Sequence, residues 1–139
     1  MLRSGLVFAG VKISESAGDD GVLTALETTY LNLLGTQLVV LSACDTATGD
    51  ITTGEGVYGL KRALVLAGSE SQLISLWKVV DEATKDLMIN YYQRLQKGKG
   101  RTEALRKLQL EMIQKNDQYS HPYYWSSFIP SGDWTPMKN

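Results

Sequence analysis

The sequence predicts an α/β fold in which helices flank a mostly parallel sheet on both faces. Short apolar segments rich in β-branched residues alternate along the chain with longer segments whose apolar residues recur at helical spacing. The resulting order is strand, helix, strand, helix, strand, helix, helix, strand, which favours parallel strands joined by helical crossovers. The chain has 139 residues, of which 43% are hydrophobic and 21% are charged, so it forms at most one domain with a substantial core.

Five elements are expected in the first half of the chain. Thr24 and Glu27 have the spacing of a capping box, which predicts a short helix directly after Thr24. Gly35 and Gly68 are placed to end helices, because glycine adopts the left-handed conformation at little cost. The four apolar residues from Leu38 to Leu41 predict a central strand buried on both faces. In order, the elements are a strand at 5–9, a polar loop at 11–21, a helix at 25–31, a strand at 37–44 and a helix at 56–66.

The second half is predicted to hold two strands and two longer helices. Asp81 is a favourable N-cap for the first of these helices, and Thr102 can cap the second. Pro130 lacks a backbone N–H, so the last strand is not expected at the centre of a sheet. In order, the elements are a strand at 71–77, a helix at 82–96, a helix at 103–115 and a strand at 123–129.

Composition argues against several classes of function. The net charge of −1 provides no electrostatic footprint for nucleic acid or acidic membranes, and no apolar run is long enough for a membrane span or a signal peptide. One cysteine allows no internal disulfide, which fits a cytoplasmic protein. One cysteine and one distant histidine do not form a zinc site. The segment from Gly54 to Gly59 matches the bare dinucleotide-binding pattern but does not directly follow a strand, so no cofactor is expected.

Cys44, the only cysteine, follows the apolar run of the strand at 37–44. The carboxyl ends of strands are where ligands bind and chemistry occurs in open α/β sheets, so a thiol at this position is a candidate nucleophile. Cysteine is also one of the most frequently buried residue types, and a structural role is the alternative. The thiol must lose its proton to act as a nucleophile. The N-terminus of the helix at 56–66 or a general base would promote that loss.

A series of short motifs occurs in order along nearly the whole chain. They are Leu2 to Gly10, Leu38 to Thr46, Gly54 to Leu60, Ala67-Gly68, Ser75 to Val79, Asp81 to Thr84, His121 to Trp125 and Gly132 to Trp134. With these motifs the chain resembles the CHAT family, which comprises caspase-like cysteine peptidase domains often carried beside tetratricopeptide repeats. The resemblance implies a single partial CHAT domain over 1–139, with a caspase-like sheet truncated on its N-terminal side.

The resemblance also implies roles for individual residues. Cys44 takes the position of the nucleophile. Asp81 resembles an acid at the floor of a pocket for a basic side chain, although a helix N-cap is an equally simple role. The family's catalytic histidine lies in a His–Gly motif upstream of the segment matched by residues 2–10. His121, the only histidine, falls in another motif, where a hydrogen-bonded structural role under the aromatic residues is favoured. Glu55 is expected to be a solvated loop acid.

Two classes of function follow. One is a cysteine endopeptidase segment that is inactive alone and prefers a basic residue before the scissile bond if a partner supplies the histidine. The alternative is a non-catalytic interaction module, or an expressed fragment of a larger tetratricopeptide-repeat protein. The expected partners are a polypeptide, an upstream histidine-bearing segment or a tetratricopeptide-repeat protein. A truncated sheet leaves an unpaired edge at 5–9 or 37–41, so a homodimer or higher oligomer is expected.

Overall fold

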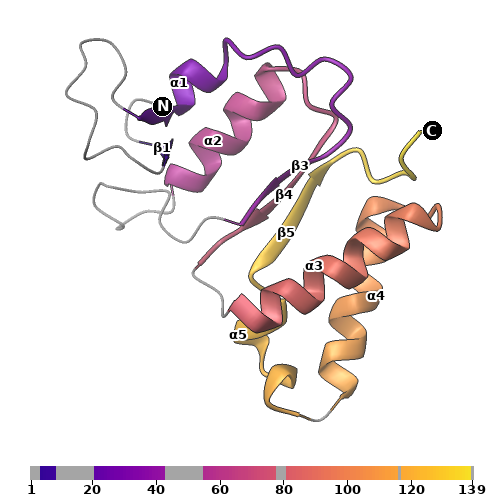
Figure 1. Cartoon of the computed structure of the whole chain (residues 1–139). Coiled ribbons are helices and arrows are strands. Elements are labelled where there is room, and N and C mark those ends of the chain that lie inside the picture. The colour runs from indigo at the N-terminus through magenta and orange to yellow at the C-terminus, as the bar shows by residue number, and fades with distance from the viewer. Residues whose placement is uncertain (1–3, 9–20, 43–54, 78–80, 116, 139) are drawn as a thin grey trace. The chain divides into compact units, whose positions relative to one another are not determined.

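The structure, a computed structural model, describes residues 4–8, 21–42, 55–77, 81–115 and 117–138 (Figure 1). It contains helices and two sheets, which confirms the α/β fold class. The described residues form two compact units: unit 1 within 1–36 and 45–69, and unit 2 within 37–44 and 70–139. No helix among the described residues combines the length and apolar character needed to cross a bilayer.

Unit 1 contains a two-stranded antiparallel sheet, β1 (Gly5–Val7) and β2 (Val22–Thr24). The first strand was expected to join the parallel sheet, and this expectation was wrong. Instead Gly5 lies opposite Thr24 and Val7 opposite Val22. The second strand was not predicted, because three residues next to a helix cap are too few to show a period. Their extended conformation is stabilised by pairing with β1.

The helices of unit 1 are α1 (Ala25–Thr28) and α2 (Glu55–Leu66). The capping box is confirmed: the Thr24 hydroxyl accepts the Glu27 N–H at 3.1 Å, and the Glu27 carboxylate accepts the Thr24 N–H at 2.8 Å. α1 ends three residues before the predicted position, because the next three N–H groups donate to carbonyls only three residues back. Gly68 follows α2 with φ of +102°, as predicted for a helix stop.

Unit 2 is built on a three-stranded sheet in the order β3 (Val39–Leu41), β4 (Ser71–Ser75), β5 (Phe128–Gly132). β3 is parallel to β4, whereas β5 is antiparallel to it, so the sheet is only partly parallel. The segment at 37–44 was expected to be central, but within this sheet β4 holds the centre and all five of its residues are buried. Pro130 lies in β5, which is an edge strand of this sheet. The prediction that the strand with Pro130 is not central is therefore confirmed.

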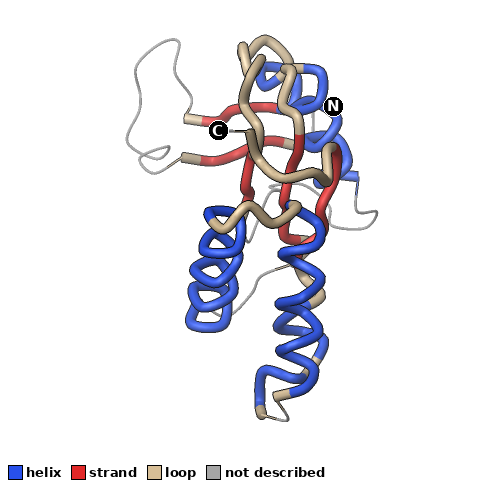
Figure 2. Tube along the Cα trace, turned by 90° about the vertical axis from the view of Figure 1, so that its right-hand side faces the viewer, coloured by secondary structure: helices blue, strands red, loops and turns tan. Residues whose placement is uncertain are grey.

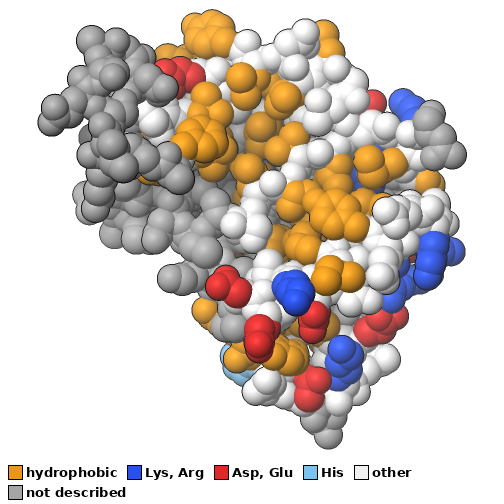
Figure 3. Space-filling model, in the orientation of Figure 1, with side chains coloured by type: hydrophobic (Ala, Val, Ile, Leu, Met, Phe, Trp, Pro, Cys, Tyr) orange, Lys and Arg blue, Asp and Glu red, His pale blue; other side chains and the backbone are white. Residues whose placement is uncertain are grey.

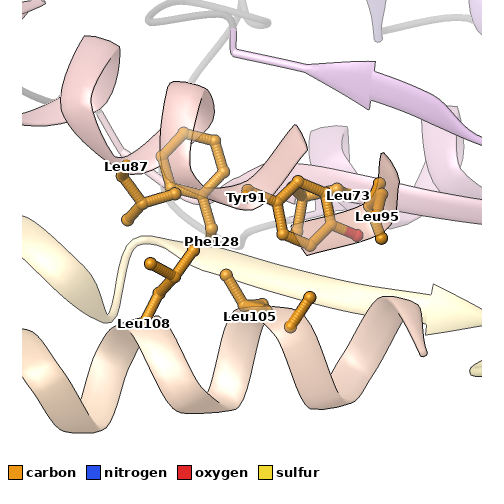
Figure 4. Close-up of a cluster of buried hydrophobic side chains, with 8 residues drawn as sticks. Leu73, Leu87, Tyr91, Leu95, Leu105, Leu108 and Phe128 are labelled. Atoms are coloured by element: carbon orange, nitrogen blue, oxygen red, sulfur yellow. The ribbon is translucent and has the colours of Figure 1, made fainter. Parts of the chain in front are cut away.

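A helical hairpin of α3 (Asp81–Gln96) and α4 (Arg101–Gln114) packs on this sheet (Figures 1 and 2). Their apolar stripes meet Leu73 of β4 and Phe128 of β5 in the core of the unit (Figure 4). α4 begins at Arg101, two residues before the predicted start at residue 103, and its N-cap is Gly100 and not Thr102. The backbone explains this start, because the Arg101 N–H donates to the Thr135 carbonyl at 3.4 Å. The buried apolar residues of the two helices are Ala83, Leu87, Tyr91, Leu95, Ala104, Leu105 and Leu108.

The segment before β5 is helical, which corrects the prediction of a strand beginning at Tyr123. It forms a short 3-10 helix, η1 (Gln118–Ser120), and one turn of α-helix, α5 (Pro122–Trp125). Proline at the first helical position has the φ angle of a helix and no N–H that needs a partner. His121 caps the same turn, so local chemistry overrides the β propensity of the aromatic residues.

A buried charge cluster lies at the amino ends of β3 and β4. Arg101 is only 2% exposed, and its guanidinium is 3.2 Å from carboxylate oxygens of both Glu70 and Asp133. It also donates to the Gln37 side chain at 3.3 Å, and that amide exchanges two hydrogen bonds with the backbone of Lys138. Through these contacts the C-terminal segment at Lys138 is held beside the first residues of β3 and β4.

Candidate functional site

The candidate site is the edge of the sheet where β3 and β4 both end, because the carboxyl ends of parallel strands meet on one side. β3 ends at Leu41 and β4 at Ser75. Ser42 follows β3 and is exposed. Cys44 comes two positions later and lies outside the described residues, so its role as nucleophile stays a prediction.

Asp81 is the first residue of α3 and is exposed. It was predicted as the N-cap, but it lies within the first helical turn beside Glu82. A carboxylate in the first turn is stabilised by the positive end of the helix dipole. Among the described residues, none forms an ion pair with Asp81. The structure does not test the predicted contact with a substrate.

Two aromatic residues hold α5 against the end of β4. The Trp77 indole N–H donates to the Tyr123 carbonyl at 3.1 Å, and the two rings stack at 6.5 Å with an interplanar angle of 25°. Tyr124 meets Tyr123 edge to face at 5.4 Å and Tyr119 at 5.3 Å. The contact of Trp77 with Tyr123 joins segments 46 positions apart, and no local pattern in the sequence indicated it.

His121 has a structural contact, in agreement with the favoured interpretation. Its Nδ1 accepts the Tyr123 N–H at 3.2 Å and so caps α5. The side chain is exposed and does not lie under the aromatic residues, which corrects that part of the expectation. A histidine is an unusual N-cap, so this role is hard to recognise from the sequence.

Glu55 was expected in a loop, but it is the first residue of α2. Helix α2 also contains Gly56 and Gly59, so these glycines are part of a helix. In the described ranges, no group of three or more histidine, cysteine, aspartate and glutamate side chains is arranged to hold a metal ion.

The whole sequence was compared with known proteins and families. The sequence model of the CHAT domain matches residues 1–133. The chain belongs to the CHAT domain family. This CHAT chain is also 33% identical over 111 residues to tetratricopeptide repeat protein 28 of Mus musculus, and 32% identical to the protein of the same name from Homo sapiens. Each alignment covers 80% of the CHAT chain but only 4% of the relative.

Sequence reasoning missed Arg101, the most deeply buried charge among the described residues of the CHAT chain. Arg101 was expected to precede its helix, and nothing in its neighbourhood distinguishes it from the surface residues Arg94 and Arg106. Its partners come from positions 37, 70 and 133, which only the tertiary structure brings together. Because this cluster lies at the amino ends of the strands, it supports the sheet and is remote from the candidate site.

Proposed function

We propose that this CHAT chain belongs to a larger tetratricopeptide-repeat protein and acts as a protein-interaction module whose binding edge is β3. The length of the relatives supports the first part, since the chain spans 4% of each and both are named for the repeat. The second part rests on one observation: no strand among the described residues pairs with the outer edge of β3. We further propose a cytoplasmic location, because a single cysteine suits a reducing compartment.

The edge of β3 has the properties of a docking strand. β3 pairs with β4 on one side, and no strand among the described residues pairs with the other. Its three residues, Val39, Val40 and Leu41, are apolar and only partly buried. An edge of this kind offers unpaired N–H and C=O groups to an added strand.

The opposite edge of the same sheet is less suited to pairing. β5 carries Pro130, which has no N–H and is exposed. Proline on an edge strand is a known protection against strand addition. The two edges therefore differ in a way that favours β3. In the simplest case the added strand comes from a second copy of the chain.

Sedimentation equilibrium at micromolar concentration tests whether the chain associates through β3. We expect a dimer or higher oligomer for the wild type and a monomer for Val39→Lys, since a charge on an edge opposes pairing. Ile129→Lys places the same change on β5 and serves as the matched control, for which association should persist. A wild-type monomer near 15.4 kDa would contradict the proposal. So would equal association of the two variants, provided that circular dichroism shows both to be folded.

The second candidate is a cysteine endopeptidase completed by a histidine-bearing segment. The position of Cys44 after β3 and the exposed Asp81 carboxylate support it. In this reaction the base removes the thiol proton, and the thiolate attacks the scissile carbonyl while backbone N–H groups bind the developing oxyanion. The protonated base then gives its proton to the leaving amine as the C–N bond breaks, and water hydrolyses the resulting thioester. A carboxylate suits an arginine side chain, because the two pair by parallel hydrogen bonds.

Reporter peptides distinguish the two candidates. The chain alone should not hydrolyse arginyl or lysyl peptides, because a general base contributes roughly 10²–10⁴-fold to the rate. Addition of a histidine-bearing CHAT segment should then produce turnover that Cys44→Ala abolishes and Asp81→Asn reduces. Turnover unaffected by Cys44→Ala would contradict the peptidase. Continued inactivity with the added segment would leave the interaction module as the function.

A further inference from the structure

A cavity of about 210 Å³ opens between α3 and α4 in unit 2. Residues at the spacing i, i+3, i+4, i+7 line it, from Ala83 on α3 and from Leu108 on α4 to the C-cap Lys115, together with Tyr119 of η1. Charged side chains of both signs gather over this part of the unit (Figure 3). The cavity lies entirely within unit 2 and includes neither β3 nor Asp81, so it is independent of the function proposed above.

The inner wall of the cavity is apolar. Leu87 and Leu108 are 3% and 5% exposed and belong to the core cluster, and Met112 packs against that cluster. A cavity of roughly 150 Å³ lined by such residues is known to hold benzene. The cavity between the helices is partly open to solvent, and its volume is sufficient for one branched or thioether side chain. Methionine adapts its shape to different occupants, so the wall favours no single apolar side chain.

The rim of the cavity carries two opposite charges that the fold does not use. Glu111 is occupied, since both of its oxygens accept from Arg94 at 2.8 and 2.7 Å. By contrast, within the described residues neither Asp86 on α3 nor Lys115, the C-cap of α4, has an ion-pair partner. An acidic and a basic residue thus line the same cavity, one from each side of the helix pair.

We propose that this cavity binds an α-amino acid with a large apolar side chain. The Asp86 carboxylate accepts hydrogen bonds from the α-ammonium group, and the Lys115 ammonium donates to the α-carboxylate. The side chain enters between Leu87, Leu108 and Met112 and is removed from water there. A residue inside a polypeptide has neither a free α-ammonium group nor a free α-carboxylate group, so the site does not bind it. Glycine binds weakly, because it leaves the apolar wall uncovered.

Titration of the full chain with L-leucine or L-methionine, followed by ¹H–¹⁵N correlation spectra, tests this site. We expect saturable shifts confined to residues of α3, α4 and η1. Leucinamide lacks the carboxylate and N-acetyl-leucine lacks the ammonium group, so each should bind at least about tenfold more weakly, as expected for loss of one charged hydrogen bond. Glycine should give no saturable shift. The two leucine derivatives also distinguish a free amino acid from the first or last residue of a peptide.

Two exposed positions allow substitution without disturbing the core. Asp86→Asn and Lys115→Gln should each weaken leucine binding by about tenfold or more. In addition, Lys115→Gln should abolish the preference for leucine over leucinamide. Lys107→Gln is the matched control, because Lys107 lies on α4 but pairs with Glu103 at 2.6 Å, outside the cavity. The same spectra report whether each variant is folded.

Three results would overturn the proposal. The first is the absence of saturable shifts with either amino acid. The second is leucinamide or N-acetyl-leucine binding as tightly as leucine, which would mean that only one charge is recognised. The third is equal loss of binding in Lys107→Gln and Lys115→Gln, which would place the ligand elsewhere on the helices. Because none of these measurements depends on oligomeric state or peptidase activity, they leave the proposed function untouched.

Discussion

Replacement of Arg101 by methionine removes the buried charge but keeps most of the apolar stem. The guanidinium makes two ion pairs at 3.2 Å and further hydrogen bonds at 3.3 Å to the Gln37 side chain and the Asp133 carbonyl. Loss of one partner from a fully buried pair costs about 3–5 kcal/mol. Here Glu70 and Asp133 are 27% and 33% exposed and can be rehydrated. Arg101 Nε also lacks a hydrogen-bond partner among the described residues, and its removal relieves that cost. We therefore expect a loss of about 2–3 kcal/mol.

Urea unfolding followed by tryptophan fluorescence measures this loss. Trp77, Trp125 and Trp134 all lie in unit 2, so the signal reports on the unit that contains Arg101. The midpoint should fall while the slope stays unchanged.

Arg94→Met is the matched control, because its pair with Glu111 is shorter, at 2.7 Å, but lies at the surface, where such pairs contribute about 0–1 kcal/mol. Equal losses in the two variants, or a loss below about 1 kcal/mol for Arg101→Met, would refute the argument from burial.

Three further predictions follow from local geometry. Gly132 has φ of +84°, and an added Cβ would meet the Glu70 carbonyl oxygen, so Gly132→Ala should lose more stability in the same urea assay than Gly98→Ala. Gly98 has φ of +73° but open space around it, so that control should lose only about 1–2 kcal/mol. Burial raises the pKa of Tyr91 to about 12, against an opposing effect of Arg101. The folded state therefore keeps a proton that the unfolded chain releases near pH 10, so stability should fall as pH rises from 10 towards 12. Ultraviolet titration should show a late phenolate component that Tyr91→Phe removes. Thr24→Ala should destabilise α1 by about 1 kcal/mol, which hydrogen exchange of its amides would detect.

Features that depend on neighbouring residues could be predicted from the sequence. The capping box of Thr24, the stop at Gly68 and the apolar stripe of α3 each arise from groups within a few positions of one another. The same holds for the α/β class and for the edge position of the strand that contains Pro130. The sequence also indicated the carboxyl end of β3 as the candidate site, because strand ends follow from where apolar residues stop.

Features that depend on distant partners were decided by the tertiary structure. β2 is extended because β1 pairs with it, and Arg101 is buried because carboxylates from positions 70 and 133 surround its charge. Tyr123 to Trp125 have β propensity, yet they form a helical turn between the His121 cap and the stacking contact with Trp77. The cavity between α3 and α4 exists because the helices leave space beside a shared core. Free energies of pairing and burial exceed local preferences of a few tenths of a kcal/mol, so residues far apart in the chain decide these features.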